Sequence, residues 1–465
     1  MIVKGRGTKY ERCGLALGTS DTVALRVGCL DDELQVGHIG GASTTASRVL
    51  PVSSQKTDSR QYSQTQPIHH LLSPVVEFSA KIGALGDILH KNSVKWWYVT
   101  TFLLYLQKKS SMNWEETYEA WRALQPLSER DRDRLSRKFT VEFNYNSNHI
   151  EGNTLTYGQT ELLLLFGKVV GEAEMKDFEE MKASNVGLLM MKEQSTLKNT
   201  PLTQTFIRQL HQTLLREDYT VYRTLPDGTV TSYVIHAGCY KTRPNSVITR
   251  YGDRFEYAAP EETTALMTDL VDWYNETEAS GEYNPLELAA LFHYRYIRIH
   301  PFEDGNGRIA RLLVNFILAR HDYPMVVVRS RKKKDYLEAL HQADLVVGPV
   351  PGDGSHASLR EARKFVNWFK KMVMEEVQND IDFIQTRDPN VWWYDGQRIA
   401  FRSQNSGRIL NVLMTEPGIT ITALAKTIGI NTSAIQKHLK SMTDKGFIAR
   451  RKKDGQWDVF IIPSA

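Results

Sequence analysis

The sequence predicts a mainly α-helical protein with a β-hairpin set into its helical core and a winged helix-turn-helix domain at its C-terminus. Apolar residues recur at helical spacing through most of the chain after residue 71. β-Branched residues gather instead between residues 229 and 257, where they indicate short strands. Residues 406–465 read as helix, helix–turn–helix and hairpin, which is typical of a winged helix.

The chain has 465 residues, which is too long for one typical hydrophobic core. We expect five segments along it. They are a poorly structured N-terminal extension (1–70), a helical region (71–200), a catalytic core (201–345), a helical connector (346–405) and the winged helix-turn-helix domain (406–465).

The overall composition is that of an ordinary soluble protein, with 41% hydrophobic and 24% charged residues. Its net charge of +4 excludes a general polycation, so any contact with nucleic acid must come from a local patch. The three cysteines, Cys13, Cys29 and Cys239, show neither metal spacing nor a disulfide framework. No apolar run approaches the ~20 residues that span a bilayer. We therefore expect a cytoplasmic protein with no membrane contact.

The N-terminal extension is rich in Gly, Ser, Thr and Gln, and residues 23–27 are its best candidate for a strand. Residues 71–108 then show helical periodicity. Asn113 is expected to cap a helix that runs to about Ala123, and a further helix is expected to begin at Ser128.

The stretch with the most chemistry is His300-Pro301-Phe302-Glu303-Asp304-Gly305-Asn306-Gly307-Arg308-Ile309-Ala310-Arg311, between two apolar runs. This context predicts a helix, a tight polar turn and a second helix. A Gly-rich turn that opens a helix binds anions, because the first helical N–H groups lack partners inside the helix. The turn adds a base, a carboxylate and arginines, which suit a nucleoside triphosphate. The Gly-Lys-Ser/Thr ending of a P-loop is missing.

Residues His300 to Arg308 match every fixed position of the pattern HPFx[DE]GN[GK]R, so the chain resembles the Fic family. The resemblance extends over roughly residues 143–345. It implies a helical Fic fold with a β-hairpin flap, and protein adenylylation as the activity.

A second motif lies upstream, where Ser147, three intervening residues and then Glu151-Gly152 match the family's inhibitory pattern [ST]xxxE[GN]. If a helix that ends at Gly152 lies over the phosphate turn, Glu151 can pair with an arginine there. That guanidinium would otherwise hold the γ-phosphate. The other interpretation is a helix end with Glu151 in solvent and Gly152 in the left-handed conformation. Because the same chain carries the HPFx[DE]GN[GK]R signature, the inhibitory interpretation is favoured over a simple helix end.

The strands expected between residues 229 and 257 lie where Fic proteins carry the flap, which holds a target segment by adding a strand. An ordinary surface hairpin that holds no target would show the same sequence pattern, so both interpretations stay open. Residues 346–358 are expected to form a loop, 359–382 a helix and 387–405 a connector. The basic cluster Arg329, Arg331, Lys332, Lys333 and Lys334 is interpreted as the solvated start of a helix.

In residues 406–465, nine basic residues against four acidic ones give a local charge of +5. That excess suits phosphate contact, so DNA is a candidate partner. Dimerisation or target docking through the same domain is an equal alternative, and a homodimer is left open.

The resemblance implies a role for each matched residue. His300 would take the proton from a Ser, Thr or Tyr hydroxyl of a target protein, and Asp304 would hold Mg²⁺ against the phosphates of ATP. The nucleotide would be bound by Gly305, Asn306, Gly307, Arg308 and Arg311, and inhibition would rest on Ser147, Glu151 and Gly152. The variable position Glu303 is given no role.

The predicted function is therefore an autoinhibited adenylyltransferase that moves AMP from ATP to a hydroxyl of a target protein or of itself. Two alternatives remain. The same site could remove AMP, with Glu151 positioning water, which would make the protein a de-adenylylase or a bifunctional switch. In the other, a DNA-binding transcriptional regulator uses the Fic fold only to sense nucleotide.

Overall fold

The computed structural model describes residues 113–169, 173–224, 228–248, 252, 254–451 and 454–464, together with the backbone of strand β1 (Val23–Leu25). Strand β1 falls within the stretch expected to be a strand. The rest of the expected N-terminal extension and the helices expected at residues 71–108 lie outside the described residues.

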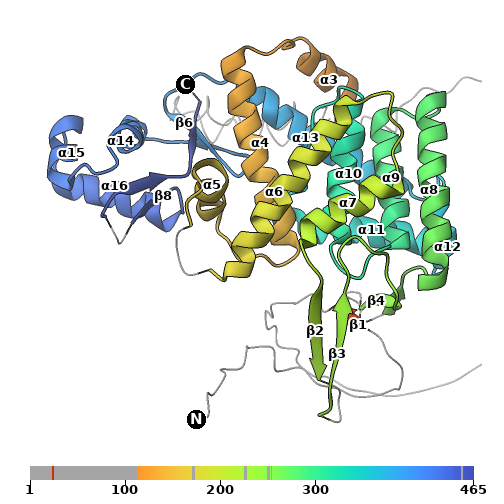
Figure 1. The fold of residues 1–465 in the computed structure, drawn as a ribbon. Helices are drawn as coiled ribbons and strands as arrows, with labels where there is room; N and C mark the ends of the chain where they lie inside the picture. The colour runs from red at the N-terminus through yellow and green to blue at the C-terminus, as the bar shows by residue number, and fades with distance from the viewer. Residues whose placement is uncertain are drawn as a thin grey trace, which may run out of the picture. The chain divides into compact units, whose positions relative to one another are not determined.

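The described chain is mainly helical, as predicted (Figure 1). Up to the signature, its helices are α3 (Trp114–Arg122), α4 (Glu129–Ile150), α5 (Tyr157–Phe166), α6 (Met175–Thr196), α7 (Gln204–Leu215), α8 (Pro260–Ser280) and α9 (Pro285–Ile299). From the signature to the end they are α10 (Asn306–Arg320), η1 (Ser330–Lys332), α11 (Lys333–Val347), α12 (Pro351–Ser355), α13 (Arg363–Gln385), α14 (Gln404–Thr415), α15 (Ile421–Ile428) and α16 (Thr432–Asp444).

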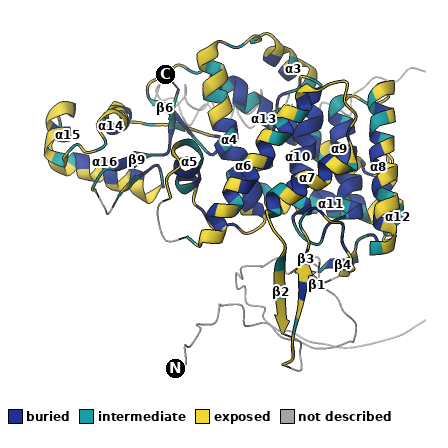
Figure 2. Ribbon diagram, viewed as in Figure 1, coloured by how far each residue is buried: buried dark blue, intermediate teal, exposed yellow. Residues whose placement is uncertain are grey.

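Helices α9 and α10 are buried along most of their length (Figure 2). Both belong to the main hydrophobic core, which suits helices that are apolar on nearly every face. The Asn284 side chain caps the start of α9, Pro285 occupies its first position, and His300 ends it at φ 50°. The signature turn is therefore anchored between two helices that the core holds in place.

Helix α4 is one continuous helix of 22 residues, longer than the sequence suggested. The Ser128 side chain accepts a hydrogen bond from the backbone N–H of Asp131 and so caps its start. At the other end Glu151 is the C-cap residue, and Gly152 follows at φ 102°, a conformation that favours glycine. The inhibitory motif thus occupies the last turn of a long helix.

The strands before the signature differ in part from the prediction. Strand β2 (Tyr219–Thr224), which the sequence did not indicate, pairs with β3 (Val230–Ile235) as an antiparallel hairpin. The expected hairpin pairs β4 (Asn245–Ile248) with β5 (Arg254–Glu256), and β1 pairs in parallel with the other edge of β4. Strand β4 is therefore the central strand of its sheet.

The segment expected to be a loop and connector carries more structure than predicted. Residues 346–358 include the short helix α12, and residues 387–405 include the hairpin β6 (Val391–Tyr394) and β7 (Gln397–Ala400). Successive side chains of a strand point to opposite faces, so Trp392 enters the C-terminal core while Trp393 enters the main core. Strand β6 thus belongs to both cores.

The predicted winged helix is confirmed. Helices α14, α15 and α16 precede strands β8 (Ile448–Arg450) and β9 (Trp457–Val459), which pair antiparallel, and strand β10 (Ile462–Pro463) returns to pair with β6. Asn431 caps α16, and Gly429 ends α15 in the left-handed conformation.

The basic cluster at residues 329–334 does lie at a helix start, where η1 leads into α11, but the interpretation of it as solvated is wrong for Arg329. Arg329 is 1% exposed and binds carboxylates of Glu142, Glu376 and Asp395 at 2.8, 2.9 and 3.2 Å. A buried guanidinium needs such partners, since an isolated charge in the interior is very costly. Its partners lie on α4, α13 and the β6–β7 turn.

Among the described helices, none has the length and apolar character needed to cross a bilayer.

Candidate active site

The signature turn brings His300 and Asn306 together through their side chains. Asn306 accepts a hydrogen bond from the backbone N–H of Phe302 (2.9 Å) and donates to the Phe302 carbonyl (2.7 Å). Its amide nitrogen also lies 3.1 Å from Nδ1 of His300. Asn306 is buried, so its side chain braces the turn. The sequence analysis had expected Asn306 to bind the nucleotide directly, which is a different role from bracing the turn.

His300 is held by a stacking partner as well as by the turn. Its ring lies parallel to that of Tyr257, with the centroids 3.9 Å apart, and it is half-buried. Burial lowers the pKa of His300 to about 3, and the nearby charge of Lys241 contributes to the shift. His300 is therefore neutral near pH 7, as a general base must be.

Asp304 faces one guanidinium and one phenol. Its Oδ2 accepts from the Tyr219 hydroxyl (2.8 Å) and from Nη2 of Arg308 (3.3 Å), and its Oδ1 accepts from the N–H of Gly305 (2.7 Å). Burial alone would raise the pKa of Asp304, but these three partners outweigh it and lower the pKa below its ordinary value. The carboxylate is thus ionised and able to bind a cation.

Glycine is required at the two glycine positions of the turn for different reasons. Gly305 has φ 76° and precedes the first residue of α10, whose first backbone N–H groups have no partner inside the helix. Gly307 has ordinary helical geometry, but a Cβ there would overlap the carboxylate of Glu151. The space left by that absent side chain is the space that Glu151 occupies.

Helix α4 brings Ser147 and Glu151 to Arg311. Nη2 of Arg311 lies 2.6 Å from Oε1 of Glu151, and the same guanidinium donates to Oγ (3.0 Å) and to the carbonyl (2.8 Å) of Ser147. Arg311 is 2% exposed, whereas the Glu151 side chain is 38% exposed. Gly152 contacts neither arginine through a side chain and serves to end the helix.

Arg308 keeps an unused donor beside this pair. It is 5% exposed, and its Nε has no hydrogen-bond partner within the described part of the chain. A buried N–H without an acceptor is rare in proteins and suits a site that an anion completes.

Taken with the contacts described above, the structure brings together all the site residues expected from the sequence.

The structure also adds residues that the sequence did not identify. His211 stacks on Phe302, with the ring centroids 3.7 Å apart, and its Nδ1 accepts from the N–H of Gly238. Its Nε2 therefore carries the proton and donates to the carbonyl of Asp304 (3.1 Å). Glu303, given no role before, accepts from the N–H and the hydroxyl of Thr242 at 3.2 and 3.1 Å.

Apart from Glu303, the added residues come from segments 50 or more positions before the signature, and no local motif marks them. His211 lies on α7 and Tyr219 on β2. Lys241 precedes β4, and Asn245, whose Nδ2 lies 2.9 Å from Nδ1 of His300, is the first residue of that strand. Their only local signal is position: Lys241 and Asn245 belong to the expected flap region.

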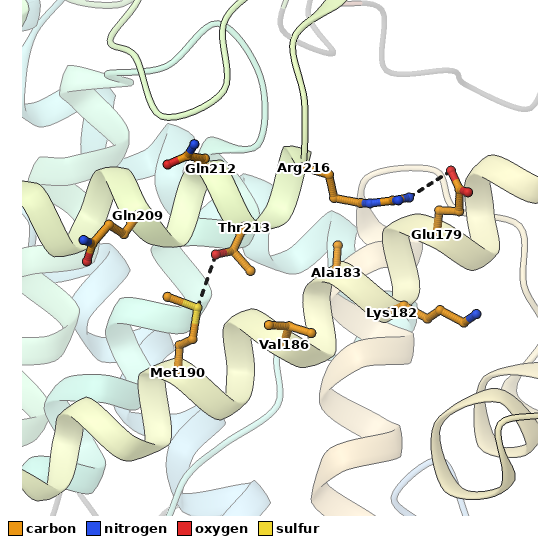
Figure 3. Close-up of a pocket in the computed structure, with 9 residues that line it drawn as sticks. All are labelled: Glu179, Lys182, Ala183, Val186, Met190, Gln209, Gln212, Thr213 and Arg216. Carbon is orange, nitrogen blue, oxygen red and sulfur yellow. Dashed lines mark hydrogen bonds and ion pairs between the residues drawn. The ribbon is translucent and has the colours of Figure 1, made fainter.

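A separate groove runs between α6 and α7 (Figure 3). An ion pair between Arg216 and Glu179 at 3.0 Å lies at its edge, and its walls are formed mainly by polar side chains. None of the site residues described above lines this groove, so it is not part of the signature site.

Comparison with known proteins places these observations in a family. Residues 201–318 match the Fic/DOC family, and residues 402–449 match a winged helix-turn-helix DNA-binding family. The protein adenylyltransferase fic-1 of Caenorhabditis briggsae is 30% identical over 258 residues, which cover 56% of this chain and 44% of that protein. The protein adenylyltransferase Fic of Nematostella vectensis is 30% identical over 200 residues, which cover 43% and 42%. The chain thus spans less than half the length of these two relatives.

A solved structure gives a fuller match. A Fic domain containing signaling protein from Bacteroides thetaiotaomicron is 53% identical and superimposes with a TM-score of 0.54. The match covers 58% of this chain and 96% of that one. With the complete signature in the turn, the fold around it and this relative, the chain belongs to the Fic/DOC family.

Proposed function

We propose that the protein is an autoinhibited protein adenylyltransferase, which moves AMP from ATP to a hydroxyl side chain of a target protein or of itself. The observation that carries this proposal is the pairing of Glu151 with Arg311, which lies with Arg308 in the first turns of α10, directly after the turn that holds His300 and Asp304. The turn and the start of α10 thus contain a neutral base, an ionised carboxylate and two guanidinium groups, and one of these guanidinium groups is already paired with a carboxylate of the same chain.

The chemistry follows from the charge that develops in the reaction. The target hydroxyl oxygen attacks the α-phosphorus, and its proton goes to His300. The bond from the α-phosphorus to the bridging oxygen breaks, and its electron pair leaves with pyrophosphate. Arg308, Arg311 and the N–H groups at the start of α10 neutralise the phosphates; a single oriented donor of this kind contributes on the order of 3 kcal/mol.

Asp304 fits the role of a Mg²⁺ anchor. Mg²⁺ is commonly held by one or two carboxylates together with substrate phosphates. Within the described residues no cluster of three metal-ligating side chains occurs, so one carboxylate plus ATP is the arrangement this site favours. When bound, the ion would supply charge neutralisation at the α- and β-phosphates.

Strand β4 would present the target to His300. An added strand needs only exposed backbone, so targets of varied sequence could be accepted. The edge of β4 away from β5 pairs with β1 of the same chain. A target segment would take the place of β1 there.

The test uses ATP labelled either at the α- or at the γ-phosphate, incubated with the protein bearing Glu151→Gly. Protein-bound label from the α-position alone is the expected result. Label from the γ-position would indicate phosphoryl transfer, and no label with either ATP would refute the proposal. Loss of label from modified protein when Glu151 is present would favour the removal of AMP instead.

A second candidate function is DNA binding through the winged helix. On α16 the exposed side chains include Gln436, Lys437 and Lys440, and neither lysine pairs with a carboxylate within the described residues. Arg451, in contrast, is paired with Asp454 at 2.9 Å. A polar, unpaired basic face on the second helix of a helix–turn–helix suits contact with the major groove.

This second function is tested by titrating duplex DNA at several salt concentrations. Replacing Lys437 and Lys440 by Glu is expected to weaken binding and to reduce the slope against log salt by about 2. Lys371→Glu, at an exposed position on α13, is the control and should leave the slope unchanged. Equal binding by both variants would rule out this face. DNA binding without any AMP transfer would favour the regulator described above.

A further inference from the structure

The tight turn between β6 and β7 contacts the helix that carries Ser147 and Glu151. Its two central residues, Asp395 and Gly396, have φ 44° and 66°, and positive φ at both positions is typical of a two-residue hairpin loop. The N–H of Gly396 donates to Oε1 of Glu142 (2.8 Å). Oδ1 of Asp395 accepts from Nδ2 of Asn146 (2.8 Å). The turn therefore binds two successive turns of α4.

Asn146 is the centre of this contact. Its Oδ1 accepts from the N–H and the hydroxyl of Ser330 at 2.8 and 3.0 Å, so its NH₂ group is the end that faces Asp395. The residue is 0% exposed, and water does not compete for these bonds. Loss of the amide would leave buried donors and acceptors unpaired. Asn146 directly precedes Ser147, the first residue of the inhibitory motif.

The opposite side of α4, which faces α6, has weaker polar contacts. Nδ2 of Asn144 donates to Oδ1 of Asn185 (3.1 Å), and Nδ2 of Asn148 lies 3.7 Å from the sulfur of Met181, a weak acceptor. Oδ1 of Asn144 and Oδ1 of Asn148 have no hydrogen-bond partner within the described part of the chain. The polar attachment of this end of α4 is thus stronger on the side of the β6–β7 turn.

Apolar contacts alone do not fix the rotation of α4 about its axis. Phe143 and Ile150 pack in the main core, and Nζ of Lys333 donates to the carbonyl of Ile150 (2.7 Å). Apolar burial is non-directional, whereas the contact between Glu151 and Arg311 at 2.6 Å needs a defined position of the carboxylate. Directional bonds from the β6–β7 turn to two turns of the helix supply that definition.

The β6–β7 turn is tied to the C-terminal domain. Trp392 of β6 lies in the C-terminal core, and β10, the last strand of that domain, pairs with β6. Near the start of α4, Nη2 of Arg134 donates to the carbonyl of Pro463 in β10 (2.9 Å). The C-terminal domain therefore contacts α4 near its start through β10 and near its end through the β6–β7 turn.

We propose that the β6–β7 turn is a clamp that holds α4 in the orientation in which Glu151 meets Arg311, and that Asn146 is the positioning residue through which it acts. This inference rests on the proposed function and deepens its regulation. It makes the C-terminal domain part of the inhibitory device. A role at the active site follows for this domain that does not require DNA.

The clamp is tested from both of its sides. Asn146→Ala removes the contact on α4. Gly396→Ala acts on the turn, because a Cβ there would lie 2.5 Å from Cζ of Arg329 and force the turn to move. Asn275→Ala is the matched control, since it also removes an amide that binds a backbone N–H and carbonyl, those of Leu202, but it lies on α8.

The first measurement is hydrogen exchange by mass spectrometry, which needs neither nucleotide nor activity. In peptides that cover residues 143–152, we expect amide exchange to become about fivefold faster in Asn146→Ala and in Gly396→Ala, because each change favours local opening of the end of α4. Asn275→Ala should leave these peptides unchanged. Unchanged exchange in Gly396→Ala, or equal acceleration in Asn275→Ala, would overturn the inference.

The second measurement is ATP affinity by calorimetry, with and without the inhibitory carboxylate. When Glu151 is present, Asn146→Ala should tighten ATP binding about threefold to fivefold, because the carboxylate leaves Arg311 more easily. In the Glu151→Gly background the same change should have no further effect, since the clamp then holds nothing that opposes the nucleotide. An equal effect in both backgrounds would show that Asn146 does not act through Glu151.

The two proposals fail differently. Faster exchange and tighter ATP binding in Asn146→Ala, with no AMP transfer by Glu151→Gly, would contradict the transfer function and leave the clamp standing. Unchanged exchange and affinity in both clamp variants, with AMP transfer by Glu151→Gly, would contradict the clamp and leave the function standing.

Discussion

Oε1 of Glu151 lies 2.6 Å from Nη2 of Arg311, at the point where the last turn of α4 meets the first turns of α10. Ser147, one turn earlier on α4, binds the same guanidinium with its hydroxyl and its carbonyl. A single arginine thus holds both ends of the inhibitory motif. An anion that binds to Nη2 of Arg311 must displace a carboxylate that is already in contact.

We expect Glu151→Gly to tighten ATP binding by about tenfold, because a charge-assisted contact with Arg311 no longer has to be broken. Glu151→Gln, which keeps the size and loses the charge, should have a smaller effect of the same sign. Isothermal titration calorimetry measures both. Glu129→Gln, exposed at the far end of α4, is the control. Unchanged affinity in Glu151→Gly would show that the pair does not oppose the nucleotide.

Tyr219→Phe should lower the Mg²⁺ concentration needed for half-maximal AMP transfer. The Tyr219 hydroxyl donates to Oδ2 of Asp304, so its removal leaves that oxygen free for the cation. A Mg²⁺ titration of the Glu151→Gly protein, with and without Tyr219→Phe, measures the effect. A higher Mg²⁺ requirement would mean that the phenol orients Asp304 for the metal instead of competing with it.

Arg329→Met should lower the free energy of unfolding by about 3–5 kcal/mol, because the carboxylates of Glu142 and Glu376 would remain buried without their main cation. Urea unfolding measures it. Arg331→Met, at a side chain 37% exposed that pairs with Asp395, is the matched control and should cost about 1 kcal/mol or less. Similar losses in the two variants would contradict the importance of burial.

Stability should fall as the pH drops from about 6.5 towards 3, in part through His293. This side chain is 2% exposed, and its Nε2 lies 2.8 Å from the Tyr336 hydroxyl. Burial, with help from the charge of Arg311, lowers its pKa to about 3. The unfolded chain therefore binds a proton in this window that the folded chain does not, so unfolding is favoured at lower pH. His293→Gln should flatten the dependence of urea midpoints on pH; an unchanged slope would exclude His293 as a source.

The parts of the fold that the sequence predicted are those with local causes. Ser128 was expected to begin a helix from its local sequence, and its side chain caps the start of α4 in the structure. The signature turn was predictable for the same reason, since its glycines and polar residues act within a few positions. The inhibitory pair needed one further step, because Glu151 and Arg311 are 160 residues apart, and only the two motifs together linked them.

The features of the fold and the site that the sequence did not predict depend on contacts between distant segments. Nothing near Arg329 in the sequence shows that it is buried with Glu142 and Glu376. Its charge alone therefore led to the prediction that it is exposed to solvent. Tyr219 and Asn245 likewise belong to the site only through contacts with Asp304 and His300, which lie far away in the sequence. Strand β6 was hidden because Trp392 and Trp393 are both buried, in different cores, and therefore show no alternation of polar and apolar residues.

The measurement that tests the central claim most directly is the intact mass of the purified protein after incubation with ATP and Mg²⁺, for Glu151→Gly and for Glu151→Gly combined with His300→Ala. The account predicts the addition of one or more AMP groups to hydroxyl side chains in the single variant and no addition in the double variant. An unmodified single variant that binds ATP, or equal modification of both proteins, would contradict it.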